Sequence, residues 1–95
     1  MEVESVIRGL TALAQPTRLA TFILLAEAGD AGMGATQIAA GIGVPANTMS
    51  SHLMILVRAG LVEQSRRGRN ITCRAIPSRV LELSSFLSGL VAPGN

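Results

Sequence analysis

The stretch from Gly43 to Arg58 constrains the fold most, because a tight turn leads there into a helix with two unlike faces. At the helical period, one stripe of this helix is apolar and carries Met49, Leu53 and Leu56. The opposite side carries short polar side chains and little charge, at Asn47, Ser50, Ser51 and Arg58. Such a face suits base edges and phosphates in a DNA groove, whereas a solvated face usually carries Lys and Glu. Two interpretations follow, a DNA-contacting helix and an amphipathic core helix with an ordinary surface.

A second helix is predicted directly before this stretch, over about 35–42, with Ile38 and Ile42 on its inner side. Gly43 follows it and is suited to the left-handed position that ends a helix. Only Val44 and Pro45 then separate it from the two-faced helix over about 46–58. Two helices joined by so short a turn predict a helix-turn-helix.

A β-hairpin is predicted after the two-faced helix. Extended runs over about 61–66 and 71–76 flank a tip at 67–70, where Gly68 and Asn70 are available for positive φ. Because the hairpin follows a helix-turn-helix and is rich in arginine, it is expected to be the wing of a winged helix.

The other elements are predicted helices. Residues 3–14 and 78–91 show apolar side chains at helical spacing, and residues 17–28 are apolar nearly all round, which places that helix at the centre of the domain. Residues 30–34 are expected to form a loop. The order predicts a mainly α fold with a small β-hairpin, a winged helix-turn-helix that forms one domain over 1–95.

Charge is concentrated in one segment. The chain has a net charge of +2 and every basic residue is arginine. Six of the eight arginines lie between Arg58 and Arg79 and are opposed there by Glu63 alone, so that segment carries 6 − 1 = +5, while residues 1–57 carry −2. Arginine makes forked contacts to phosphate, which favours a nucleic-acid partner.

Composition narrows the class of protein further. The chain is 48% hydrophobic, more than one small core readily hides, which favours an oligomer. The longest apolar runs reach five residues, too short for a membrane span of about 20. The acidic start lacks a signal-peptide pattern and the chain has a single cysteine, so a cytoplasmic location is expected.

Several segments, taken in order, resemble one known family. They are Leu-Ala-Gln-Pro-Thr-Arg-Leu at 13–19, Ile-Ala at 38–39 with Ile-Gly-Val at 42–44, Asn-Thr-Met-Ser-Ser-His-Leu at 47–53, Ala-Gly-Leu-Val at 59–62 and Arg-Gly-Arg at 67–69. Together they resemble the ArsR (arsenic-repressor) family of bacterial winged-helix transcription regulators. The resemblance covers residues 5–90 and implies a homodimeric repressor that leaves its double-stranded DNA operator when an inducer binds.

The resemblance also assigns roles. It implies that the front of the recognition helix enters the major groove with Asn47, Thr48, Ser50 and Ser51. Many members have His where this chain has Ser51, and Pro45-Ala46 replaces a common Ser-Gln, so the operator is expected to differ from the typical one.

Three arginines are expected to contact phosphate or the minor groove, namely Arg58 at the end of the recognition helix and Arg67 and Arg69 beside the tip glycine. Alternatively, Arg58 pairs with Glu63 and the hairpin is merely solvated. His52, half inward on the helical wheel, is expected either to pack the helix against its neighbours or to contact phosphate or a base.

The dimer is expected to form through the first and last helices of two subunits on an inverted-repeat operator. Six apolar side chains are predicted to be buried there: Val3, Ile7, Leu10, Leu83, Leu87 and Leu90.

The sequence offers no metal or cofactor site. Family members that sense metals use cysteine pairs, whereas residues 33–36 here read Met-Gly-Ala-Thr. Cys73 is interpreted as an apolar filler under the wing or as a redox sensor. Two other functions remain open, a protein-interaction module without operator binding and an enzyme that uses Cys73 and His52, although no third orienting group is evident. The inducer is unknown.

Overall fold

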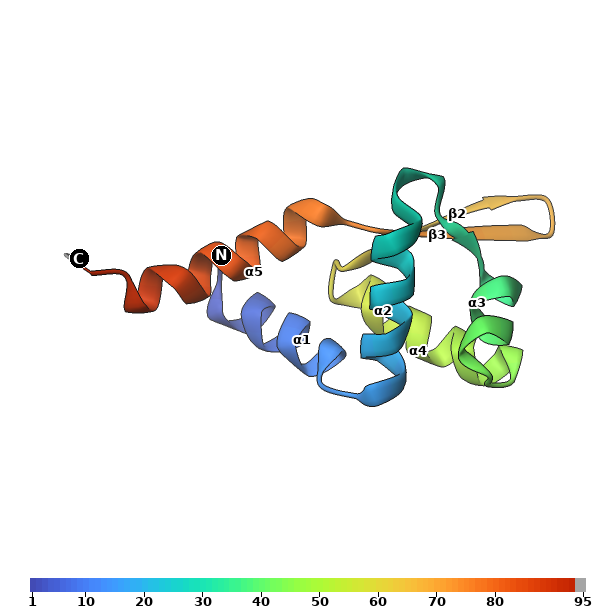
Figure 1. Ribbon diagram of the computed structural model, residues 1–95, viewed down its shortest axis with the longest axis horizontal. Coiled ribbons are helices and arrows are strands. Elements are labelled where there is room, and N and C mark those ends of the chain that lie inside the picture. The colour runs from blue at the N-terminus through green and yellow to red at the C-terminus, as the bar shows by residue number, and fades with distance from the viewer. Residues whose placement is uncertain (94–95) are drawn as a thin grey trace.

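The computed structural model describes residues 1–93 and shows five α-helices and a small sheet (Figure 1). The molecule is elongated, 51 × 23 × 21 Å, with the hairpin at one end and the last helix at the other. In chain order the elements are α1 (Val3–Leu13), α2 (Pro16–Ala28), the 3-10 turn η1 (Gly29–Ala31), β1 (Met33–Gly34), α3 (Ala35–Ile42), α4 (Ala46–Arg58), β2 (Val62–Arg67), β3 (Asn70–Ala75) and α5 (Pro77–Val91). The mainly α winged helix-turn-helix prediction is confirmed. The last two residues of the predicted domain, 94–95, lie outside the described part.

The helix ends follow from local chemistry. Pro16 opens α2, and the Gln15 side chain accepts a 2.8 Å hydrogen bond from the Arg18 backbone N–H, which satisfies one unpaired donor at that end. Gly43 ends α3 with φ +86°, the left-handed conformation expected from the sequence. The α3–α4 turn is therefore short enough to make the two helices neighbours.

The core lies between α4, α2, α3 and the root of the sheet. Met49, Leu53 and Leu56, the predicted apolar stripe of α4, are all fully buried there. The prediction for α2 is only half right. This helix buries Leu25 but leaves Leu19 and Ile23 exposed, so one side of it stays open to solvent.

The sheet has a third strand that the sequence did not predict. Its order is β1-β3-β2, all antiparallel, and Met33 and Gly34 of β1 pair with Cys73 and Thr72 of β3. The predicted loop at 30–34 is thus a 3-10 turn and a short strand. Gly32 permits this close approach, because it has φ +68° and a Cβ added there would lie 2.5 Å from the Cys73 carbonyl oxygen.

Within the described residues, none of the helices has both the length and the apolar character needed to cross a membrane.

Replacing Gly32 with alanine is expected to destabilise the fold more than the same change at Gly29. Both glycines have positive φ, but a Cβ at Gly29 would meet nothing within 4 Å. Gly29→Ala should therefore cost only the left-handed conformation, about 1–2 kcal/mol, and Gly32→Ala at least about 1 kcal/mol more from the backbone clash. Urea unfolding of the two variants measures the difference. Equal losses would show that β1 does not need this approach.

Candidate nucleic-acid interface

The outer face of α4 is polar and exposed. Asn47, Thr48, Ser50 and Ser51 are all exposed, while Met49 between them is buried. The Asn47 side-chain oxygen accepts from the Thr48 backbone N–H at 3.0 Å, and the Ser51 hydroxyl donates to the Asn47 carbonyl oxygen at 3.4 Å. Local hydrogen bonds therefore orient the Asn47 and Ser51 side chains, and all four exposed residues keep donors or acceptors that are open to solvent.

The wing lies at the same end of the molecule as the α3–α4 turn (Figure 1). Arg67 pairs with Asn70 across the hairpin, so Gly68 and Arg69 form a two-residue tip. Gly68 has φ +63°. Every residue with positive φ in the described part of the chain is a glycine, so Asn70 does not adopt the left-handed conformation that the sequence analysis allowed for it. Both tip-flanking arginines are exposed.

The tip and the helix-turn-helix share a surface groove. Arg69 to Thr72 form one wall of a hollow of about 400 Å³, and residues 34–37, at the start of α3, form the other. The wing and the helix-turn-helix are therefore adjacent parts of one surface, with an exposed guanidinium at its edge. Arg58, at the opposite end of α4, is also exposed.

The hairpin arginines differ in their surroundings. The strand register pairs Arg66 with Ile71, so Arg66 lies on the same face of the hairpin as the core-facing residues. Arg67 lies on the opposite face. Arg74 is half-buried and is held within the fold, because its Nε donates to the Asp30 carbonyl oxygen at 2.8 Å and its Nη1 donates to the Ser65 hydroxyl at 3.2 Å. Arg74 thus fixes the root of the wing to η1.

His52 is half-buried, and its Nδ1 lies 3.3 Å from Nη1 of Arg18 on α2. The same guanidinium donates from Nε to the Ala12 carbonyl oxygen at 2.7 Å. This arrangement supports the packing interpretation of His52. Arg18 entered the sequence-based predictions only as part of a family motif. Its position three residues after Gln15 indicates the start of a helix, but it does not indicate which groups the side chain contacts.

Cys73 is fully buried in β3, and the Gln64 side-chain amide donates to its sulfur at 3.6 Å. Burial raises the pKa of the Cys73 thiol, and the Gln64 hydrogen bond offsets this only in part. A buried thiol that keeps its proton is a poor nucleophile and a poor redox sensor, so the filler interpretation is favoured. Cys73 is hydrogen-bonded to Gln64, and His52 is hydrogen-bonded to Arg18. These contacts give no support to an enzyme in which Cys73 and His52 act together.

In the described part of the chain, no three His, Cys, Asp or Glu side chains gather closely enough to hold a metal ion.

The predicted interface residues fall into two groups. Five are exposed large hydrophobic side chains, namely Val3, Ile7, Leu10, Leu87 and Leu90. Leu83 differs, since it is only 5% exposed and packs against Gly9 of the same chain, where an added Cβ would lie 3.1 Å from Leu83 Cδ1. The helical wheel did not distinguish these cases, because it shows which side chains share a face but not what covers them.

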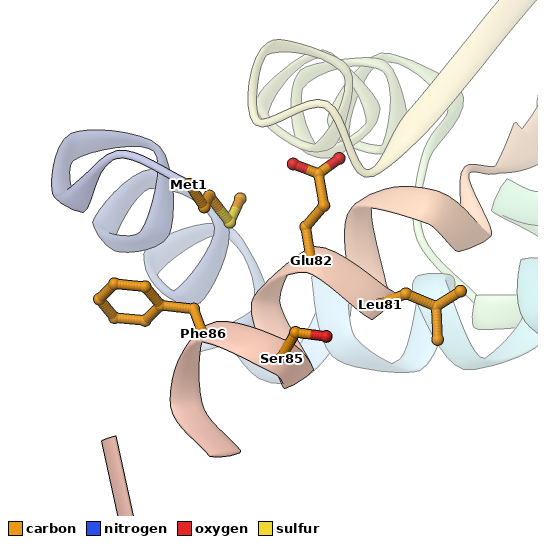
Figure 2. Close-up of a pocket in the computed structure, with 5 residues that line it drawn as sticks. All are labelled: Met1, Leu81, Glu82, Ser85 and Phe86. Carbon is orange, nitrogen blue, oxygen red and sulfur yellow. The ribbon is translucent and has the colours of Figure 1, made fainter. Parts of the chain in front are cut away.

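Figure 2 shows a further opening between the start of α1 and α5. Met1 and Phe86 lie near each other there, beside Glu82, around a hollow of about 410 Å³. The exposed apolar side chains of α1 and α5 thus continue into a surface that this chain does not fill.

Comparisons with known proteins agree with this architecture. A family model described as a helix-turn-helix domain matches residues 13–65. An ArsR-like transcriptional regulator from Rhodococcus sp. RHA1 has a TM-score of 0.82 at 27% identity over 94% of this chain and 81% of its own. A crystal structure titled as a possible transcriptional regulatory protein from Mycobacterium bovis, fragment 1–100, has a TM-score of 0.75 at 30% identity over 95% and 92%.

A solution structure from Mycobacterium bovis is titled a homodimeric winged helix-turn-helix DNA-binding domain of a possible ArsR-family regulator. It has a TM-score of 0.72 at 28% identity over 98% of this chain and 88% of its own. Among curated protein sequences, none matches this chain. The fold, the helix-turn-helix match and these likenesses define a winged-helix transcriptional regulator, and the chain belongs to the ArsR family.

Stability at alkaline pH should reveal the buried thiol. The chain has no Lys or Tyr, so Cys73 is the main side chain that titrates between pH 8 and 10. The folded pKa of Cys73 is raised above the unfolded value of 9.0, so its contribution is full below pH 9 and is lost as the pH rises toward the folded pKa. The free energy of unfolding should fall there by at most about 1.4 kcal/mol per pH unit.

Cys73→Ala is the control, because it removes the thiol and leaves every other titratable group in place. Urea unfolding between pH 8 and 10.5 should show a shallower decline for this variant, whatever stability it loses at pH 8. Parallel declines would mean that Cys73 is accessible in the native state, and the sensor interpretation would return.

Proposed function

We propose that this protein is a homodimeric repressor that binds an inverted-repeat operator through α4 and the wing and is released by an inducer of unknown identity. The observation that carries the proposal is the exposed, hydrogen-bonding face of α4 at the same end of the molecule as the arginine tip. A helix of this kind fits the major groove, and a flanking hairpin fits the backbone or the minor groove.

Phosphate contact is assigned to Arg58, Arg67 and Arg69. Each is exposed, and none has a recorded hydrogen bond to another part of the described chain, unlike Arg74. Arg67 and Arg69 flank Gly68, so both lie at the most projecting part of the hairpin. Neutralising phosphates with such side chains releases condensed counterions and gives most of the affinity that does not depend on sequence.

Base contact is assigned to Asn47, Thr48, Ser50 and Ser51 on the first two turns of α4. Asparagine makes paired hydrogen bonds to adenine, and serine and threonine contact either kind of base pair. The face has no charge of its own until Arg58, so affinity from the wing and selectivity from α4 are expected to be separable.

The dimer assignment is carried by the exposed apolar side chains of α1 and α5. Leu83 is the one residue of α5 that is buried within the chain, and the half of α5 beyond it leaves Leu87 and Leu90 exposed. A two-fold arrangement of two subunits covers such a surface on both at once and sets two copies of α4 toward successive major grooves, about 34 Å apart. Because Leu83 is already covered by Gly9, we place it next to the interface rather than in it.

The alternative is a protein-interaction module that uses the same apolar surfaces without an operator. The polar face of α4 and the free tip arginines favour DNA over this alternative, because a module of that kind has no use for either feature.

Substitutions in the wing and in α4 are expected to separate the two contributions to binding. Arg69→Ala should weaken binding to all duplexes alike and lower the slope of log affinity against log salt by about 0.9 per subunit. Asn47→Ala should instead change which duplexes are selected from a random pool and leave the slope unchanged. Arg8→Ala, at an exposed position of α1, is the charge-matched control.

Fluorescence anisotropy with duplexes from the region upstream of the gene, at several salt concentrations, gives both readouts. An unchanged slope for Arg69→Ala would remove the wing from the interface. Absence of any sequence preference in the wild-type protein would favour the interaction module.

A negative charge on α5 tests the dimer. Leu90→Glu should weaken self-association at least about 100-fold, because it would bury an unpaired carboxylate at the proposed interface, and should leave the monomer folded, since Leu90 is 68% exposed. Ser78→Glu adds the same charge to the exposed first turn of α5 and should have little effect. Sedimentation velocity reports the association state. A Leu90→Glu dimer as tight as the wild type would place the interface elsewhere.

A further inference from the structure

The Arg18 guanidinium joins three helices. Its Nε donates to the Ala12 carbonyl oxygen at 2.7 Å and its Nη2 points to the Thr11 carbonyl oxygen at 3.4 Å, both in the last turn of α1. Its Nη1 donates to His52 Nδ1 on α4 at 3.3 Å. The base of the side chain is fixed as well, because the Arg18 backbone N–H donates to Gln15.

The contact with α1 holds the charge in place. Carbonyl groups at the end of a helix lack partners and carry a partial negative charge, so a guanidinium there is stabilised by hydrogen bonds and by the helix dipole. The shortest of the three contacts is to α1, and it does not depend on His52. The cation therefore stays where it is, and the ring must adapt to it.

Arginine can only donate, so His52 can only accept. The neutral ring with its proton on Nε2 meets this requirement. A protonated ring would set an Nδ1–H against an N–H of Arg18 at the 3.3 Å separation and would place two positive charges together. Histidine is the side chain whose charge changes most readily between pH 5 and 8.

Other charged groups on the elements around His52 are exposed. They are Glu4 and Arg8 on α1, Glu27 on α2, Arg58 on α4 itself, and Glu63, Arg66 and Arg67 on β2, which packs against α4, whereas α3 carries no charged residue. Among the described residues, the recorded polar contact of the ring is with Arg18. In the part of the chain that the structure describes, the ring has no hydrogen bond to a carboxylate that would compensate a positive charge on His52.

We propose that Arg18 and His52 form a positioning pair that fixes α4 relative to α1, and that protonation of His52 breaks the pair and weakens operator binding. The inference rests on the proposed function, since it concerns the helix assigned to base contact. His52 directly follows Ser51 and lies one turn beyond Thr48, so the pair holds α4 within one turn of the residues assigned to DNA. Through α1 the pair also connects α4 to the proposed dimer surface.

The test compares the wild-type protein with His52→Asn. Asparagine carries its amide oxygen on Cγ, the atom that also carries Nδ1 in histidine, so it keeps an acceptor for Arg18 and does not titrate. The probe is a duplex selected from a random pool by the tag-free wild-type protein at pH 8. Between pH 7.5 and 5.5, wild-type affinity should fall about five- to tenfold more than that of His52→Asn, the effect of one ordinary hydrogen bond.

Parallel pH profiles for the two proteins would overturn the proposal. Circular dichroism at each pH separates a shift of α4 from unfolding, and a wild-type protein that unfolds over the same range as it loses DNA would also overturn it. A wild-type protein that selects no duplex at pH 8 contradicts the proposed function instead.

The pair can be tested without DNA as well. His52 is the only histidine, so ring ¹⁵N signals in the tag-free protein belong to it without further assignment. At pH 8 they should show the proton on Nε2, and Arg18→Gln should change the populations of the two neutral forms. A ring that carries its proton on Nδ1 at pH 8 would refute the pair even if operator binding were confirmed.

Discussion

Burial of the α4 stripe is the interaction on which the rest of this structure depends. Met49, Leu53 and Leu56 are each at most 1% exposed, and burying side chains of this size contributes about 1.5–3 kcal/mol each. Thr21 of α2 also approaches this stripe, with its hydroxyl 3.7 Å from the Met49 sulfur. Because a helix has a fixed period, burying one stripe determines which residues face outward. The polar face of α4 is therefore a consequence of core packing.

The sequence predicted α4, the turn before it and the hairpin because each depends on local information. A repeat of apolar residues, a glycine at a helix end and a glycine at a two-residue tip act over a few positions. Strand β1 has only two residues, so it shows no alternation, and its existence depends on pairing with Cys73 some 40 positions away. The partners of Arg18 were unpredictable for the same reason, since they belong to two other helices.

The apolar pattern of α5 does not indicate which of its leucines are buried within the chain, as Leu83 shows. Leu83, Leu87 and Leu90 recur at helical spacing of four and then three residues, yet only the first is covered within the chain. Gly9 contributes to the difference, because its missing side chain lets α5 approach α1 closely at the level of Leu83. A helical wheel shows one face, whereas in the structure that face is divided between an intrachain contact and an open surface.

The arginine-rich segment is likewise divided by the fold. Arg74 is tied to Asp30 and Ser65, and the Arg79 guanidinium lies over Gly60, where an added Cβ would be 2.8 Å from its Nε. Arg74 and Arg79 are half-buried, whereas the other arginines of this segment are exposed. Local charge in the sequence therefore overstates the charge available for binding. The same residue type builds the scaffold where carbonyl groups need donors and remains free where the chain projects into solvent.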